Sequence, residues 1–195
     1  LLLRPVRVDN KEPVASDGTF PHQPVVLAKS SDPLRNIRHP AFDHAIFNTR
    51  LRGDYCMVRT NSDSLWNQAP VLGYETGLAS LSVAPNTFVP SAMADSLTSF
   101  GGIIFGPNGQ TSLLAFIAAG AAGSYGTVTE PLADYTKFPD PQAYLYQSRG
   151  FTLAEAYYQS LAVPFLGLIV AEPPAAPFQQ TASGSWLGVD SNAVL

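Results

Sequence analysis

The stretch from Ala94 to Pro131 constrains the fold of this chain more than any other. It contains a Gly101-Gly102 turn, a helix-period apolar segment and a tight loop of small residues ending in Glu130-Pro131. Residues 110–119 are predicted to form a buried helix, and Gly120 stands where a helix end takes the left-handed conformation. The apolar face of this helix is expected to consist of Leu113, Leu114, Phe116 and Ile117.

Strand and helix signals alternate along the rest of the chain. Strands are predicted over Val25–Ser30, Tyr55–Thr60, Val71–Tyr74, Ala121–Thr129 and Leu166–Ala171. The last is expected to be buried, because every residue in it is apolar or glycine. Thr152 and Glu155 form a capping box that starts a helix, which ends near Pro164. This order predicts an α/β domain with a partly parallel sheet flanked by helices.

Proline and small-residue segments suggest where the domain ends. Residues 1–40 hold six of the seventeen prolines and predict an extended arm, with one helical turn near its end and another over Asp43–Phe47. Residues 132–146 are predicted to form a loop across the sheet edge. The α/β domain is therefore assigned to residues 41–178, and residues 179–195 to an irregular tail.

The composition points to a chain with covered surfaces. Only 13% of the residues are charged and 46% are hydrophobic, so part of the surface is expected to contact a partner protein or a second copy through the arm and tail. Nine of the eleven Lys and Arg residues lie at or before Arg59, without a cluster, which disfavours nucleic-acid binding. No apolar run reaches the length of a membrane span.

Cys56 is the only cysteine, so the chain can form no internal disulfide and no cysteine-rich metal site. Its place in a predicted strand suggests a small buried apolar side chain. A nucleophilic role is the alternative, but no neighbour in the sequence would favour the reactive thiolate.

Four motifs resemble an uncharacterised family of exported bacterial proteins that is distantly similar to gingipain-type, caspase-like cysteine peptidases. They read ADSLTSFGG, AGAAGSYGTVTEP, KFPDP and GFTLAEAYYQSLAVPFLGLIVAEPPAAPF, and they match the C-terminal half of that family between residues 55 and 178. The resemblance implies a caspase-like fold and an exported protein: periplasmic, cell-surface or extracellular. It also implies a missing upstream half, so that the chain would be a fragment, a processed chain or a short form.

The residues that a caspase-like peptidase needs are replaced in this sequence. The family pattern implies a histidine at one strand end and a cysteine at the next, but the corresponding segments read Tyr74–Leu78 and Leu97–Gly101. All three histidines (His22, His39 and His44) lie far upstream. Ser99 is a weak catalytic candidate, since a serine nucleophile needs a base within reach. The alternative is that Ser99 only occupies a turn.

Polar side chains near the expected strand ends are candidates for a ligand pocket, because α/β folds bind ligands at the carboxyl ends of their strands. They are Thr98, Ser99, Ser124, Tyr125, Thr127 and Glu130, of which Ser124 and Glu130 are also weak catalytic candidates. Equally, these groups can serve only to satisfy buried backbone.

No metal site or cofactor is expected. His39, Asp43 and His44 have the chemistry of zinc ligands, but Pro40 disturbs their spacing. Asp134 and Asp140 are the alternative, as calcium ligands in a loop. Arg52-Gly53-Asp54 spells an adhesion tripeptide that a turn explains equally well.

These observations favour a non-catalytic, exported binding or structural subunit on a degenerate caspase-like scaffold, within a larger protein assembly. The alternative is a hydrolase or peptidase-like enzyme whose non-standard site is completed by a missing half or by a partner chain.

Overall fold

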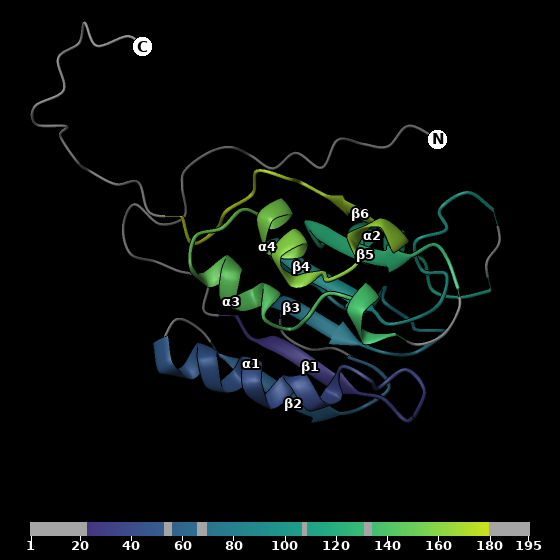
Figure 1. Ribbon diagram of the computed structural model, residues 1–195, viewed down its shortest axis with the longest axis horizontal. Coiled ribbons are helices and arrows are strands. Elements are labelled where there is room, and N and C mark those ends of the chain that lie inside the picture. The colour runs from purple at the N-terminus through teal and green to yellow at the C-terminus, as the bar shows by residue number, and fades with distance from the viewer. Residues whose placement is uncertain (1–22, 53–55, 66–69, 107–108, 131–133, 180–195) are drawn as a thin grey trace, which may run out of the picture.

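The computed structural model describes residues 23–52, 56–65, 70–106, 109–130 and 134–179. They form a six-stranded sheet with helices on both faces (Figure 1). The strands are β1 (Val25–Lys29), β2 (Met57–Asn61), β3 (Val71–Thr76), β4 (Phe88–Ser96), β5 (Gly123–Thr127) and β6 (Gly167–Ala171). The helices are α1 (His39–Arg52), α2 (Leu113–Ala118), α3 (Ala143–Ser148) and α4 (Leu153–Ser160), with 3₁₀ turns η1 (Tyr135–Lys137) and η2 (Pro164–Leu166).

The strand order is β2-β1-β3-β4-β5-β6, and only the β5–β6 pair is antiparallel. The carboxyl ends of the five parallel strands therefore meet at one edge of the sheet. This arrangement confirms the predicted α/β fold with a partly parallel sheet. None of the helices in the described ranges combines the length and apolar character that crossing a bilayer requires.

Two apolar layers cover the sheet. Strand side chains alternate between the faces, so Val25 and Leu27 pack on the side of α1, α3 and α4, while Val26 and Ala28 pack on the other side. On that second face Phe116 of α2 packs against Tyr74, with ring centroids 6.4 Å apart.

The central stretch folds largely as predicted. Ser112 caps α2, whose described range is shorter than residues 110–119, and Gly120 has a φ of +106°. Only Leu113 and Phe116 of the predicted apolar face are buried. The capping box is also confirmed: the Glu155 amide donates to the Thr152 hydroxyl, and the Glu155 carboxylate accepts from the Thr152 amide.

The predicted extended arm, residues 1–40, is too long. Val25–Lys29 is an interior strand between β2 and β3, and α1 begins at His39, so the arm from residue 23 onward belongs to the α/β body. The helix extends far beyond the predicted turn because Phe42, Ala45 and Thr49 lie on one buried stripe. The first two strands of the sheet thus come from this chain itself.

Three further expectations are corrected. Residues 132–146 were expected to be a loop, but α3 begins at Ala143; five of its six residues are buried, which removes the amphipathic pattern. Every residue of β6 is half-buried rather than buried, because β6 is an edge strand. Cys56 is exposed, since it precedes edge strand β2.

Candidate functional site

A cavity of about 260 Å³ lies at the carboxyl edge of the sheet, where β4 and β5 end. We call it the carboxyl-edge pocket. Its lining residues are Leu34, Arg35, Leu97, Thr98, Ser99, Glu130, Lys137 and Phe138. They come from the loop after β1, the turn after β4, the end of the β5 loop and η1, four segments that are distant in sequence.

The turn after β4 is held in place by hydrogen bonds on both sides. The Thr127 hydroxyl of β5 lies 2.7 Å from the Thr98 carbonyl and 2.8 Å from the Ser99 carbonyl. The Thr98 hydroxyl donates to the Gln110 side-chain oxygen at 2.5 Å, and the Phe100 amide donates to the same oxygen at 2.8 Å. This wall of the pocket is therefore fixed before any ligand arrives.

The turn also passes unusually close to β5. A Cβ atom on Gly126 would lie 2.4 Å from the backbone of both Gly101 and Gly102, and one on Gly102 would lie 2.2 Å from the Gly126 carbonyl oxygen. Only glycine permits this approach of two backbones. The SFGG and SYGT motifs are thus in direct contact.

The structure separates the predicted pocket residues into two groups. Thr98, Ser99 and Glu130 line the carboxyl-edge pocket. Ser124, Tyr125 and Thr127 are buried in β5 and do not line it: the Ser124 hydroxyl has no hydrogen-bond partner among the described residues, and the Tyr125 hydroxyl donates to the Lys137 carbonyl.

Lys137 is one of five lining residues that the sequence analysis did not name as pocket candidates; the others are Leu34, Arg35, Leu97 and Phe138. The Lys137 side chain is 2% exposed, and its ammonium donates one long hydrogen bond, 3.4 Å, to the Thr129 carbonyl. The Glu130 carboxylate lies 4.0 Å away, and the ammonium stands 5.7 Å from the centre of the Phe138 ring. One feature of the sequence could have identified it: Lys137 and Arg149 are the only Lys and Arg residues after Arg59.

The crevice between β1 and β3, where the strand order reverses, is closed by the chain itself. Such a switch point is the usual ligand position in open α/β sheets. Here Ser30 donates its hydroxyl to the Gly77 carbonyl, and a Cβ on Gly77 would lie 1.9 Å from the Arg35 carbonyl oxygen. The loop after β1 thus fills the crevice and leaves the open cavity beside β4.

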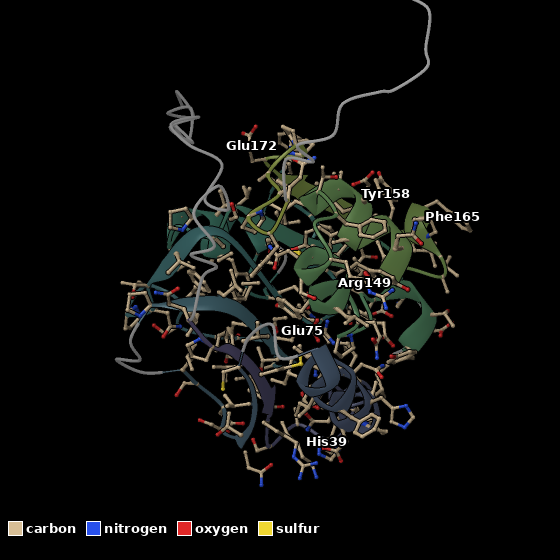
Figure 2. The ribbon with its side chains drawn as sticks, turned by 90° about the vertical axis from the view of Figure 1, so that its left-hand side faces the viewer. His39, Glu75, Arg149, Tyr158, Phe165 and Glu172 are labelled. Atoms are coloured by element: carbon tan, nitrogen blue, oxygen red, sulfur yellow. The ribbon has the colours of Figure 1, made fainter. Side chains whose placement is uncertain are left out.

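A buried charge cluster lies behind the pocket, at the same ends of β3 and β4. Arg38 contacts Asp95 at 2.5 Å and Glu75 at 3.5 Å, and it also donates to the carbonyls of Thr76 and Pro139. All three charged side chains are at most 4% exposed (Figure 2 labels Glu75 in the interior). No local sequence pattern predicts this cluster, because its members meet only in the folded sheet.

Burial governs the protonation of the cluster. Burial, together with the neighbouring Asp95 carboxylate, raises the pKa of Glu75 well above its usual range, although Arg38 opposes the shift. Burial alone would lower the pKa of Arg38, but the carboxylates of Asp95 and Glu75 raise it. We infer that Asp95 carries the negative charge that pairs with Arg38, and Glu75 the proton.

The expected metal candidates are engaged elsewhere. Asp43 pairs with Arg59 at 2.9 Å, and the His39 ring packs 5.7 Å from that of Phe42. The Asp134 carboxylate caps η1, and Asp140 accepts hydrogen bonds from the Gln142 amide and the Tyr135 hydroxyl. Within the described ranges, no group of three or more His, Cys, Asp or Glu side chains could hold a metal ion.

The tripeptide Arg52-Gly53-Asp54 extends beyond the described residues, which end at residue 52 and resume at residue 56, and His22 also lies outside them. His39 and His44 belong to α1 and do not line the carboxyl-edge pocket.

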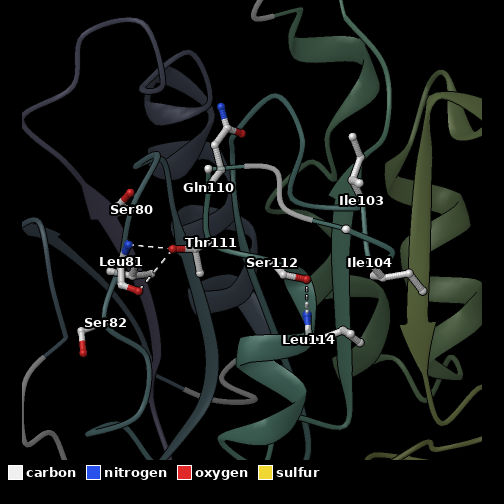
Figure 3. A pocket seen from close by; sticks show the side chains of 11 residues that line it. Ser80, Leu81, Ser82, Ile103, Ile104, Gln110, Thr111, Ser112 and Leu114 are labelled. Carbon is white, nitrogen blue, oxygen red and sulfur yellow. Dashed lines mark hydrogen bonds between the residues drawn. The ribbon is translucent and has the colours of Figure 1, made fainter. Parts of the chain in front are cut away.

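A larger groove of about 730 Å³ lies on the α2 side (Figure 3). Two of its four hydroxyl residues are committed to the fold: Thr111 bonds to the amide and carbonyl of Leu81, and Ser112 accepts from the Leu114 amide (Figure 3). The lining of this groove contains no charged residue, whereas Arg35, Glu130 and Lys137 line the carboxyl-edge pocket, which we therefore take as the candidate site. Comparisons of the chain with protein-family models, with curated proteins and with solved structures find no match.

Proposed function

We propose that this protein is a non-catalytic binding subunit that receives a ligand or a partner's side chain in the carboxyl-edge pocket. The composition of the pocket carries the proposal: two cations, two hydroxyl groups and one carboxylate line it, whereas the same eight residues include neither a histidine nor a cysteine. Pocket walls of this kind hold polar groups in place, but they lack the imidazole–thiol pair of cysteine peptidases.

We further propose that the scaffold is a degenerate caspase-like one and that the protein is exported, as the sequence resemblance implies. The positions of two segments support the scaffold. Gly77 directly follows β3, and Leu97 directly follows the adjacent parallel strand β4. The resemblance implies the histidine and the cysteine at these two strand ends.

Blocking the pocket tests the binding function. We expect a ligand-observed NMR screen of a mixed fragment library to yield binders whose signals are lost with Ser99→Trp, because the indole would fill the cavity. Ser82→Trp, at an exposed serine of the other groove, is the matched control and should retain them. Binders that are unaffected by Ser99→Trp, or a screen without binders, would contradict this function.

A hydrolase is the alternative function, and one observation favours it. Ser99 and Lys137 line the same cavity, and serine–lysine pairs occur among serine hydrolases, although a partner chain could also complete the site. The alternative predicts that a fluorophosphonate probe adds to Ser99, seen as a mass increase of the intact protein that Ser99→Ala removes. Our proposal predicts no adduct.

The edge strand β6 supports a place in a larger assembly. It is apolar and uncharged, it pairs only with β5 among the described strands, and Phe165 just before it is 80% exposed. Figure 2 shows Phe165 and Tyr158 at the outer surface on the side of α4. An exposed apolar edge favours pairing with another chain. We propose a second copy, joined edge to edge about a two-fold axis.

We therefore expect a dimer by light scattering, and Phe165→Glu should weaken it at least tenfold, because a central aromatic side chain dominates such contacts. Phe47→Glu, on the exposed side of α1, is the control and should leave the mass unchanged. A wild-type monomer at every protein concentration would refute this assembly.

A further inference from the structure

We propose that the carboxyl-edge pocket is specific for a small monocarboxylate with a short apolar body, whose carboxylate binds the Lys137 ammonium. This inference rests on the proposed binding function and names the ligand class. It is carried by the burial of Lys137, by its few partners and by the other groups of the pocket.

Lys137 is a buried cation with unused hydrogen-bonding capacity. An ammonium has three N–H donors, and burying it is costly unless they are paired. Among the described residues, the polar contacts of the Lys137 ammonium are one 3.4 Å hydrogen bond to the Thr129 carbonyl and a 4.0 Å approach to Glu130. Both distances lie at the outer limit for such interactions. An anion in the pocket would accept hydrogen bonds from the ammonium that these contacts do not supply.

Ser99 offers a second donor on the same cavity. Its carbonyl accepts from Thr127, but its hydroxyl takes part in no hydrogen bond with another described residue. The Thr98 hydroxyl, in contrast, already donates to Gln110. A carboxylate can accept from an ammonium with one oxygen and from a hydroxyl with the other, which makes it a better fit than a neutral carbonyl.

The remaining walls restrict the charge and shape of the ligand. The other cation of the lining, Arg35, is already paired with Asp32 at 2.5 Å. The Glu130 carboxylate stands 4.0 Å from the Lys137 ammonium and would repel a second negative charge, so phosphate, sulfate and dicarboxylates are disfavoured. Leu34, Leu97 and Phe138 are the apolar residues of the lining and suit a branched or short alkyl group. The cavity volume, about 260 Å³, suits a small ligand and is below the range of pockets that hold drug-sized molecules.

Titration calorimetry and ¹H–¹⁵N NMR with 3-methylbutyrate as the probe test this inference on the full chain. We expect saturable binding with shifts at Thr98, Ser99 and Lys137, and at least tenfold weaker binding of 3-methylbutyramide, of acetate and of inorganic phosphate. Lys137→Met should weaken 3-methylbutyrate binding by about 10- to 100-fold, the usual effect of losing a hydrogen bond to a charged group. Lys137→Arg should restore part of it.

Glu130→Gln gives a second readout that does not depend on Lys137. Since it removes the repelling charge, it should strengthen succinate and phosphate binding more than 3-methylbutyrate binding. Urea unfolding of each variant establishes that it is folded. If Lys137→Met does not fold, the monocarboxylate proposal is tested by the selectivity of Glu130→Gln and by the comparison of 3-methylbutyrate with its amide.

Equal binding of the carboxylate and its amide, or unchanged binding in folded Lys137→Met, would overturn the monocarboxylate proposal. So would the absence of any carboxylate binding. If neutral or cationic fragments bind instead and are lost with Ser99→Trp, the binding function stands and only the ligand class fails.

Discussion

Replacing Arg38 with methionine is expected to lower the free energy of unfolding by about 3–5 kcal/mol, the usual effect of leaving a buried charge without its partner. Methionine fills much of the same volume, so the loss reflects charge rather than a cavity. In the variant, Asp95 would lose its 2.5 Å contact with the guanidinium, and Glu75 its 3.5 Å contact. Urea unfolding at pH 7 measures the change.

Glu75→Gln is the matched control within the same cluster. Because the raised pKa of Glu75 favours its protonated form in the folded protein, a neutral amide should replace it with a change below about 1 kcal/mol. A large loss with Glu75→Gln, or a small one with Arg38→Met, would contradict this account of the cluster.

The loss in Arg38→Met should depend on pH in a defined direction. A carboxyl group with a raised folded-state pKa favours folding below its unfolded pKa, and this contribution is lost as the pH rises through the folded pKa. Without Arg38, both carboxyl groups would bind protons still more tightly in the folded state. The deficit should therefore be largest at neutral pH and shrink as the pH falls toward the ordinary values of 4.5 for Glu75 and 3.8 for Asp95.

Gly126→Ala is expected to destabilise the protein by about 3 kcal/mol or more, at the upper end of the cost of overpacking. The added methyl group would lie 2.4 Å from the backbone of Gly101 and Gly102, and backbone cannot move away as a flexible side chain can. The turn that carries Ser99 must then shift, so ligand binding should weaken as well. Thermal and urea unfolding report the first effect, and the fragment screen reports the second.

Gly101→Ala is the control for the general effect of adding a methyl group in this turn. Its Cβ would lie 3.2 Å from the methyl carbon of Thr98, a contact that a small adjustment relieves. We expect a loss of about 1 kcal/mol or less. Equal losses at Gly126 and Gly101 would mean that the crossing of the two backbones is not tight.

The parts of the fold that depend on neighbouring residues were predictable from the sequence. Gly120 follows the end of α2 and Thr152 with Glu155 starts α4, as predicted, because capping is settled within one helical turn. The α/β order followed from the same local signals. Helix α3 escaped prediction because nearly all of it is buried, so its sequence carries no polar face.

Properties that depend on the place of a segment in the sheet were not predictable. The apolar residues of β6 read as a buried strand, yet an edge position leaves each of them half-exposed. Three of the predicted pocket residues, Thr98, Ser99 and Glu130, line a cavity at the carboxyl edge. Lys137 was missed because its approach to the pocket depends on η1, and η1 depends on the turn capped by Asp134.

The short segment from Ser30 to Arg38 performs three tasks at once. It seals the crevice between β1 and β3, contributes Leu34 and Arg35 to the pocket wall, and delivers Arg38 to the buried carboxylates. Its two ends are anchored, and so is its middle, where the Arg35 carbonyl meets Gly77. The length of this segment is therefore constrained. Adding or removing one residue would displace the Arg38 guanidinium, the loop that closes the crevice and the pocket wall together.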